Sequence, residues 1–178
     1  GETRIPTNIT LGANGLTYSS IVESSRELLI SPNLWTFVGD ALAGSIPFIM
    51  RVETTIANET FTVPTNGSGY LYTVNWGDGS ALEAGLLGNA SHEYAVAGEY
   101  NIEITGEFPQ IFIDNGPDKD KILSIEQWGN INWSTFQNSF LGCSNLVINA
   151  TDTPNLSGVL FMGAMFSGAS SLVDNGGN

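Results

Sequence analysis

Two stretches of alternating side chains, residues 70–76 and 100–104, constrain the fold of this chain more than any other feature. Tyr, Val and Trp recur at every second position of the first stretch, and Tyr and Ile do so in the second. A period of two places each set on one face of a strand. The GDGS segment at residues 77–80 favours a tight turn, in which Asp78 can accept backbone hydrogen bonds. The sequence therefore predicts two half-buried strands of one sheet.

Further strands are expected on both sides of this pair. Residues 48–54 (FIMRVET), 60–63 (TFTV) and 108–114 (FPQIFID) carry strand-type patterns. The Asn66-Gly67 dipeptide is typical of a hairpin-type turn, leading into the strand that starts at Tyr70. The fold class predicted is mainly β, with a few short helices.

Those helices are expected before the first strand. Residues 19–30 can place Ile and Leu side chains on one helical face, and Pro32 would end that helix. Residues 33–42 predict a second short helix. Strands remain the alternative for both segments, because serine and β-branched residues are frequent there. Residues 1–18 are expected to be irregular or to lie at an edge, since proline and glycine interrupt any period.

The last third of the chain contains an internal repeat. Residues 140–147 read FLGCSNLV and residues 166–173 read FSGASSLV, an offset of 26. This period lies in the range of leucine-rich repeats, which stack a strand and a helical turn on their neighbours. The four-residue spacing of Phe136 from Phe140, and of Met162 from Phe166, predicts one face of a short helix. Because only about one and a half repeats are visible, we expect other parts of the chain to cap the stack.

The charge balance excludes several classes of partner. The chain of 178 residues has 18 acidic and five basic side chains, a net charge of −13. Nucleic acid is not expected as a partner, because phosphate binding needs clustered cations. An anionic membrane surface is excluded by the same argument, and the absence of a 20-residue apolar run argues against direct membrane insertion. Self-repulsion of this size predicts screening by salt or neutralisation by bound divalent cations.

The N-W-G-D-G-S, S-H-E-Y and A-G-E-Y-N-I-E-I segments of the first region resemble the polycystic-kidney-disease (PKD) repeat, although Trp76-Gly77 departs from the aromatic that usually precedes GDG. That resemblance implies a small extracellular β-sandwich, an interaction or spacer module that is not an enzyme. The W-G-N-I-N-W and F-x-G-[CA]-S-x-L segments resemble BspA-like leucine-rich repeats of bacterial surface proteins, which implies adhesion. The expected division is an N-terminal segment (1–46), a PKD-like sandwich (47–113) and a leucine-rich-repeat-like lobe (114–178).

Residue types that could support catalysis lack the partners that catalysis needs. His92 is the only histidine, and it falls on the H-x-Y position where the PKD resemblance implies a bracing role. Ser80 and Ser91 have no recognisable nucleophile context. Cys143 aligns with Ala169 in the repeat, which predicts a small buried apolar side chain and an inert thiol. We therefore expect no enzymatic activity.

The best candidate for a metal site is the turn at residues 114–120. Hard oxygen ligands at short spacing suit Ca²⁺, although a plain solvated turn is the alternative. A weaker candidate lies in the tail. The expected ligands are Asp114, Asn115, Asp118 and Asp120, with Asp174 in the tail.

The W-G-N-I-N-W segment is the candidate ligand-binding groove. Trp128 and Trp133 could stack on a ligand while Asn130 and Asn132 bond to it, and packing in the repeat core is the alternative for at least one tryptophan. The acidic balance and low cysteine content resemble the large calcium-dependent, RTX-type adhesins. Together these features predict a non-catalytic, Ca²⁺-dependent module, cut from a longer extracellular bacterial surface protein, that binds a protein or peptide on another cell. A glycan-binding module and a structural spacer are the alternatives.

Overall fold

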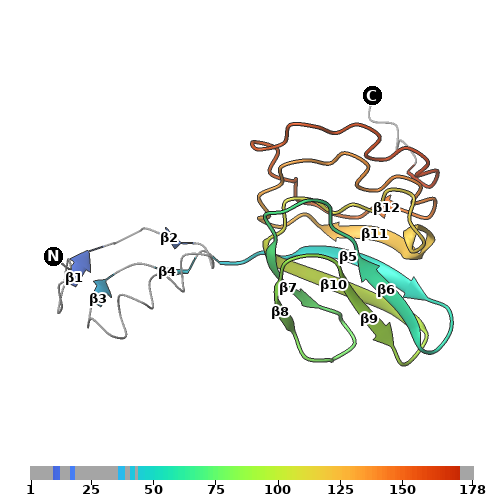
Figure 1. Ribbon diagram of the computed structural model, residues 1–178, viewed down its shortest axis with the longest axis horizontal. Coiled ribbons are helices and arrows are strands. Elements are labelled where there is room, and N and C mark those ends of the chain that lie inside the picture. Colours follow the sequence, from blue (N-terminus) through green and yellow to red (C-terminus); the bar gives the residue numbers. More distant parts are fainter. Residues whose placement is uncertain (1–9, 13–16, 19–35, 39–40, 43, 173–178) are drawn as a thin grey trace. The chain divides into compact units, whose positions relative to one another are not determined.

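The computed structural model describes residues 10–12, 17–18, 36–38, 41–42 and 44–172, and the chain divides into two compact units, Gly1–Ser45 and Ile46–Asn178. Within the described residues the protein is mainly β. Figure 1 shows its sheets and, at the C-terminal side, a series of coils.

The first unit pairs short strands in parallel. Strand β1 (Thr10–Gly12) pairs with β3 (Thr36–Val38), and β2 (Thr17–Tyr18) pairs with β4 (Ala41–Leu42). Thr10 lies opposite Thr36, the same offset as in the C-terminal repeat. The helix predicted over residues 33–42 is therefore wrong where the structure describes it, and the strand alternative holds there. The helix predicted over residues 19–30 lies outside the described residues.

The second unit contains a six-stranded mixed sheet in the order β12-β11-β5-β10-β7-β8. Only the β11–β12 pair in this sheet is parallel. A separate two-stranded sheet pairs β6 with β9, and η1 is a single 3₁₀ turn. The bounds are β5 Phe48–Thr54, β6 Glu59–Val63, β7 Leu71–Asn75, β8 Glu83–Leu86, β9 Ala90–Tyr94, β10 Gly98–Glu107, η1 Lys119–Lys121, β11 Ile122–Gln127 and β12 Val147–Ile148.

The two alternating stretches form neighbouring strands, as predicted. β7 pairs antiparallel with β10, and Val74 lies opposite Ile104, both fully buried. At the following turn, Gly77 has a φ of 81°, and a Cβ there would collide with the backbone of Asn101. The Ser80 amide donates to Asp78 Oδ1 at 3.0 Å, the turn chemistry expected from the sequence.

Side chains from both sheets meet in a single hydrophobic cluster, which includes Phe61 of β6 and Tyr94 of β9. Two expectations fail around it. Asn66-Gly67 is not a hairpin turn, because β6 and β7 belong to different sheets. Residues 108–114 form no strand, although Phe108, Ile111 and Ile113 are buried in the core.

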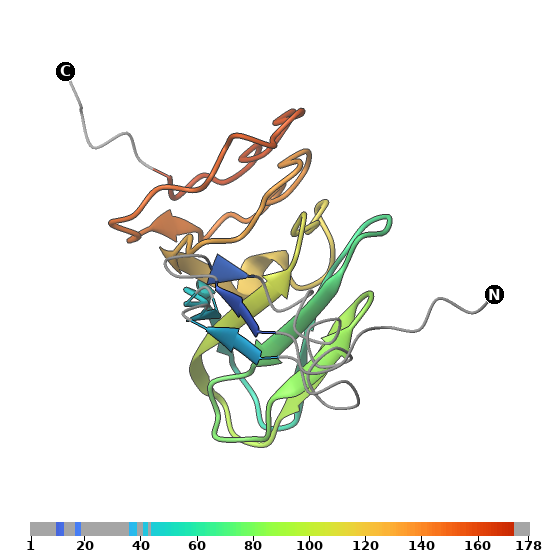
Figure 2. The same cartoon turned by 90° about the vertical axis from the view of Figure 1, so that its left-hand side faces the viewer.

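After β10 the chain winds into three stacked coils, residues 109–133, 134–159 and 160–172, which we call coils 1, 2 and 3. Backbone hydrogen bonds join equivalent starting positions: the Ser134 amide donates to Pro109 O, and the Leu160 amide donates to Ser134 O, each at 3.0 Å. Figure 2 shows the coils as successive layers, with coil 3, coloured red, furthest from the sheet. β11 belongs to coil 1 and pairs with β5, so the sheet crosses the boundary expected between residues 113 and 114.

The internal repeat is confirmed by the turns in coils 2 and 3. Four i-to-i+3 backbone hydrogen bonds in coil 2 recur in coil 3 at the positions that the repeat alignment makes equivalent; the accepting residues are Phe136, Asn138, Phe140 and Cys143, and then Met162, Ala164, Phe166 and Ala169. These are consecutive tight turns, so the short helix predicted in each repeat is wrong. Left-handed positions recur as well, because Gly142 and Gly168 both have a φ of 81°.

Candidate functional site

The two tryptophans of the predicted groove lie in the core. Trp128 is 5% exposed and Trp133 is 1% exposed, and their rings meet edge to face with centroids 6.3 Å apart. The Trp133 ring also meets the ring of Phe48 in β5 edge to face, with centroids 5.2 Å apart. Buried indoles cannot stack on a ligand while the core stays closed. The groove prediction is therefore wrong for both tryptophans, and core packing applies to each.

The asparagines between these tryptophans are exposed, and one of them holds the chain in place. Asn130 Oδ1 accepts a hydrogen bond from the Ile46 amide at 3.0 Å. The turn itself is anchored by Asp152, whose carboxylate accepts the amides of Trp128 at 3.0 Å and Gly129 at 2.8 Å. The W-G-N-I-N-W segment thus acts as a structural corner in this fold.

The acidic turn does not gather its side chains around one point. Asp114 Oδ1 accepts from Asn138 Nδ2 at 2.8 Å, and Asp120 Oδ1 accepts from Ser144 Oγ at 2.8 Å. Asn115 lies beside Gly142 of coil 2, and its amide donates to Leu141 O. Each of these residues bonds across the coil interface. Among the described residues, no three histidine, cysteine or acidic side chains lie close enough to hold a metal ion; Asp174 lies outside those residues.

Asp118 is held by a lysine and a backbone amide. Its Oδ1 lies 2.8 Å from Lys121 Nζ, and its Oδ2 accepts the Thr62 amide at 2.9 Å. Lys121 also pairs with Glu59 Oε1 at 3.1 Å. This contact joins coil 1 to β6, and the lysine supplies the positive charge that a metal ion was predicted to bring.

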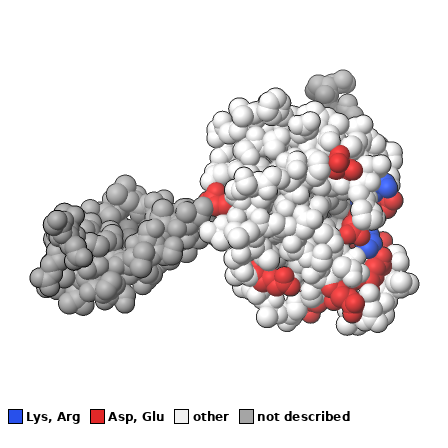
Figure 3. Space-filling view, viewed as in Figure 1, with Lys and Arg blue, Asp and Glu red and all other residues white. Residues whose placement is uncertain are grey.

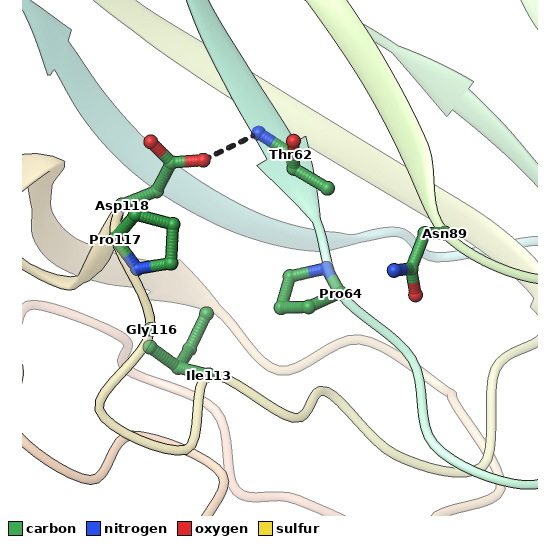
Figure 4. Close-up of a pocket in the computed structure, with 7 residues that line it drawn as sticks. All are labelled: Thr62, Pro64, Asn89, Ile113, Gly116, Pro117 and Asp118. Carbon is green, nitrogen blue, oxygen red and sulfur yellow. Dashed lines mark hydrogen bonds between the residues drawn. The ribbon is translucent and has the colours of Figure 1, made fainter.

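A small cavity of about 220 Å³ lies along the same seam. Figure 4 shows its lining, including Pro64, Pro117 and the Asp118–Thr62 hydrogen bond. Its three polar side chains are already engaged: Asp118 as above, Asn89 through the Thr65 amide at 2.8 Å, and Thr62 through Ser91 Oγ at 2.9 Å. The cavity is therefore a mainly apolar gap in the packing between coil 1 and the two-stranded β6–β9 sheet.

His92 braces the sheets, the role that the PKD resemblance implied. Its ring stacks on that of Trp76, with the ring centroids 5.0 Å apart, and its Nε2 lies 2.8 Å from Asp78 Oδ2. Hydrogen bonds, first from Ser80 and then from His92, lower the pKa of Asp78 to about 2. The carboxylate lies between the serine and the histidine, whereas a nucleophilic triad needs the histidine between the other two.

Cys143 is fully buried, as predicted. Burial raises the pKa of its thiol to about 12, because a thiolate would lose its hydration in the core. The protonated thiol is a poor nucleophile, so this cysteine is a packing residue.

The coil lobe differs sharply from the sheets in charge. Asp152 is the only charged residue among residues 128–172. Figure 3 shows an almost uncharged surface over the coils, whereas acidic side chains gather over the sheets. Coil 3 and the turn before it expose large apolar side chains instead: Leu156, Leu160, Phe161 and Met162, of which Leu160 is 79% exposed.

The outer face of coil 3 exposes positions that are core positions in coil 2. Phe136 is fully buried, but its repeat equivalent Met162 is 48% exposed. Phe140 is likewise fully buried, whereas Phe166 is half-buried. The difference arises because coil 3 covers coil 2, while no described part of the chain covers coil 3. We take this open face of coil 3 as the candidate functional site.

Sequence reasoning missed this face, although the sequence carries its signal. The chain from Trp128 to Leu172 is nearly without charge, which is visible without a structure. Only the stacking of the coils shows which side of coil 3 no described residue covers.

The comparisons with known proteins give no further guide. No family model matches the chain, and no curated protein or solved structure was found to match it. In the part of the chain that the structure describes, no helix has the length and apolar character that a membrane crossing requires.

Proposed function

We propose that this chain is a non-catalytic binding module of an extracellular adhesive protein, and that it takes a protein or peptide ligand. The observation that carries the proposal is the open face of coil 3. Contiguous exposed apolar side chains of this kind mark protein interaction sites. The near absence of charge in the lobe favours a polypeptide over nucleic acid, whose phosphates need cations.

The rest of the molecule supports a binding role. Among the described residues, side chains that could serve catalysis or metal binding are engaged in holding coils and sheets together, as His92, Asp118 and Asp152 are. The PKD-like and BspA-like resemblances add the extracellular setting to the proposal. Calcium dependence also belongs to the proposal, and it is tested by removing the metal.

The test is binding of the labelled protein to cultured cells of a panel of types. We expect Leu160→Glu to abolish binding, because it places a charge beside the apolar face without disturbing a buried contact. Leu87→Glu is the matched control, since Leu87 is a similarly exposed leucine, 70% against 79%, in the sheet region. Treating the cells with protease should remove the binding.

Three outcomes would contradict the proposal or redirect it. Binding that survives protease but is lost after glycosidase treatment would support the glycan-binding alternative. Equal loss in both leucine variants would place the binding surface elsewhere. No binding to any cell type would favour the spacer alternative. EDTA added to the same assay tests the calcium requirement.

A further inference from the structure

Coil 2 donates a regular series of backbone hydrogen bonds to coil 3. The amides of Phe136, Asn138, Phe140 and Gly142 donate to the carbonyls of Phe161, Gly163, Met165 and Ser167, at 2.7–2.9 Å. The donors occupy every second residue of coil 2, and the acceptors occupy every second residue of coil 3. The interface is therefore a ladder between two extended, turn-rich segments.

The same series of donors is open on the outer side of coil 3. The repeat equivalents of the four donors are Met162, Ala164, Phe166 and Gly168. Within the part of the chain that the structure describes, none of these four amides makes a hydrogen bond. An exposed ladder edge of this kind is a template for pairing with another chain.

This edge presents donors without acceptors between them. The carbonyls of Met162, Ala164, Phe166 and Gly168 each accept a hydrogen bond inside coil 3, from the amides of Met165, Ser167, Ala169 and Ser170. Two copies meeting face to face at this edge would therefore set donors against donors. The far end of the stack is no alternative, because coil 1 bonds there to the sheets, with the Phe112 amide donating to Pro64 O at 3.1 Å. The partner has to supply carbonyls.

We propose that the open face of coil 3 binds an extended, uncharged peptide segment of another protein, which adds to the stack as a further coil. Its carbonyls at every second residue accept from Met162, Ala164, Phe166 and Gly168. Apolar side chains of the same segment cover Met162 and Phe166, as coil 3 covers Phe136 and Phe140. This inference rests on the proposed function and names its ligand class, since strand addition takes affinity from the main chain and specificity from side-chain contacts.

The chemistry of this partner can be derived from coil 3 itself. Its residues 161–167 (FMGAMFS) are uncharged and present alternate carbonyls to the donors of coil 2. A charged residue facing Met162 would lose hydration against an apolar surface without an ion to pair with it. The probe is therefore a synthetic peptide with the sequence of residues 155–172, and the control peptide has the same composition in scrambled order.

The experiment is amide hydrogen exchange by NMR on the full 178-residue chain, at low protein concentration, with and without millimolar peptide. In the free protein we expect fast exchange at Met162, Ala164, Phe166 and Gly168, and slow exchange at their four coil 2 equivalents. The peptide should slow exchange at the four coil 3 amides by about tenfold or more, because it closes hydrogen bonds over an exposed edge. The scrambled peptide should not.

Two variants separate binding from folding. Met162→Glu should abolish the protection by the peptide, while exchange at the coil 2 amides stays slow and shows that the stack is intact. Leu87→Glu should retain the protection.

Several results would overturn the inference. Slow exchange at the four coil 3 amides in the free, dilute protein would mean that a segment of the same chain covers the edge. Slowing that grows with protein concentration alone would identify a second copy as the occupant. No change with peptide would show that the face does not accept this ligand class. If cell binding is lost with Leu160→Glu while the amides never respond to peptide, the proposed function stands and this inference fails.

Discussion

At the scale of single residues, charged side chains hold the backbone in place by accepting hydrogen bonds from its amides. Asp152 is the clearest case, because one carboxylate accepts the amides of both Trp128 and Gly129 at the corner between coil 1 and the core. Gly129 has a φ of 66°, and a Cβ there would collide with the carbonyls of Ile46 and Pro47. The corner therefore needs both a glycine and an acceptor for its amides.

We expect Asp152→Ala to lower the free energy of unfolding by about 1–3 kcal/mol, because it leaves two amides without their acceptor. Asp152→Asn keeps an acceptor oxygen and should cost less. Asp120→Ala is the control, since that exposed carboxylate accepts a serine hydroxyl and no backbone amide is lost with it. Urea denaturation measures all three. Equal costs for Asp152→Ala and Asp120→Ala would contradict the backbone role.

The low pKa of Asp78 predicts a dependence of stability on pH. A carboxyl whose pKa is lower in the folded than in the unfolded protein stabilises the fold above its unfolded value, and this contribution is lost as the pH falls toward the folded value. For Asp78 that window runs from about pH 4 down to about pH 2, given an unfolded pKa near 4.

We expect Asp78→Asn to be less stable than the wild type by about 1 kcal/mol near neutral pH, after allowance for screening by solvent. The gap should close as the pH falls through that window, because the wild-type carboxylate then becomes neutral as well. Urea titrations of both proteins across the range measure the gap. A gap that stays constant with pH would mean that the asparagine disturbs the turn for another reason.

At the scale of elements, the sequence could predict strands and the repeat, but not which surface the repeat leaves open. A period of two identified β7 and β10, and a strand-type pattern identified β5; each of these strands has one face in the core and one outside it. The Phe136–Phe140 spacing misled, since two consecutive tight turns place residues four apart on the same side just as a helix does. The sequence favoured core packing for at least one tryptophan of W-G-N-I-N-W and left a groove open for the other, and only the structure shows that both lie in the core.

The stacked pair Phe140 and Phe166 tests the coil repeat. Their rings lie 5.7 Å apart and are inclined by 13°. We expect Phe140→Ala to lower the free energy of unfolding by about 3–5 kcal/mol, as for a fully buried phenylalanine. Phe166→Ala should cost about 1–2 kcal/mol, because the open face leaves part of its ring in water. Thermal or urea unfolding measures the difference. Equal costs would mean that coil 3 is covered in solution, and the open face would then be absent.

At the scale of the whole molecule, the acidic side chains of the second unit are concentrated in one region and nearly absent from another. The sheets and coil 1 carry most of the acidic side chains of the second unit, and coils 2 and 3 carry one between them. Parallel pairing at the offset of the C-terminal repeat, 26 residues, also occurs between β1 and β3 of the first unit, whereas Thr17 of β2 lies opposite Ala41 of β4. The acidic sheets and coil 1 would repel other acidic surfaces, whereas coils 2 and 3 are nearly uncharged. This distribution suits a module that makes its contacts through coils 2 and 3.

The net charge of −13 gives the last prediction, which concerns calcium. Bound Ca²⁺ would reduce the repulsion, and it would stabilise the fold because only the folded chain brings its ligands together. At a free concentration about 100 times the dissociation constant, one site adds about 2.7 kcal/mol. Sodium chloride at the same ionic strength screens the charges but supplies no coordination, so we expect a smaller rise in Tm.

The structure sharpens this test. Asp114 bonds to an asparagine and Asp120 to a serine, and both partners could release them to a metal. Asp120 also lies 3.8 Å from Lys119 Nζ, a longer contact than the 2.8 Å between Asp118 and Lys121. We therefore expect Asp114→Asn with Asp120→Asn to abolish the calcium-dependent part of the Tm shift, while the shift produced by sodium chloride persists. Melting curves in EDTA, in Ca²⁺ and in matched salt decide the matter. If salt stabilises the protein as much as Ca²⁺ does, the acidic turn is a solvated loop of coil 1 whose side chains hydrogen-bond to coil 2. Ligand binding by the open face then does not depend on a metal.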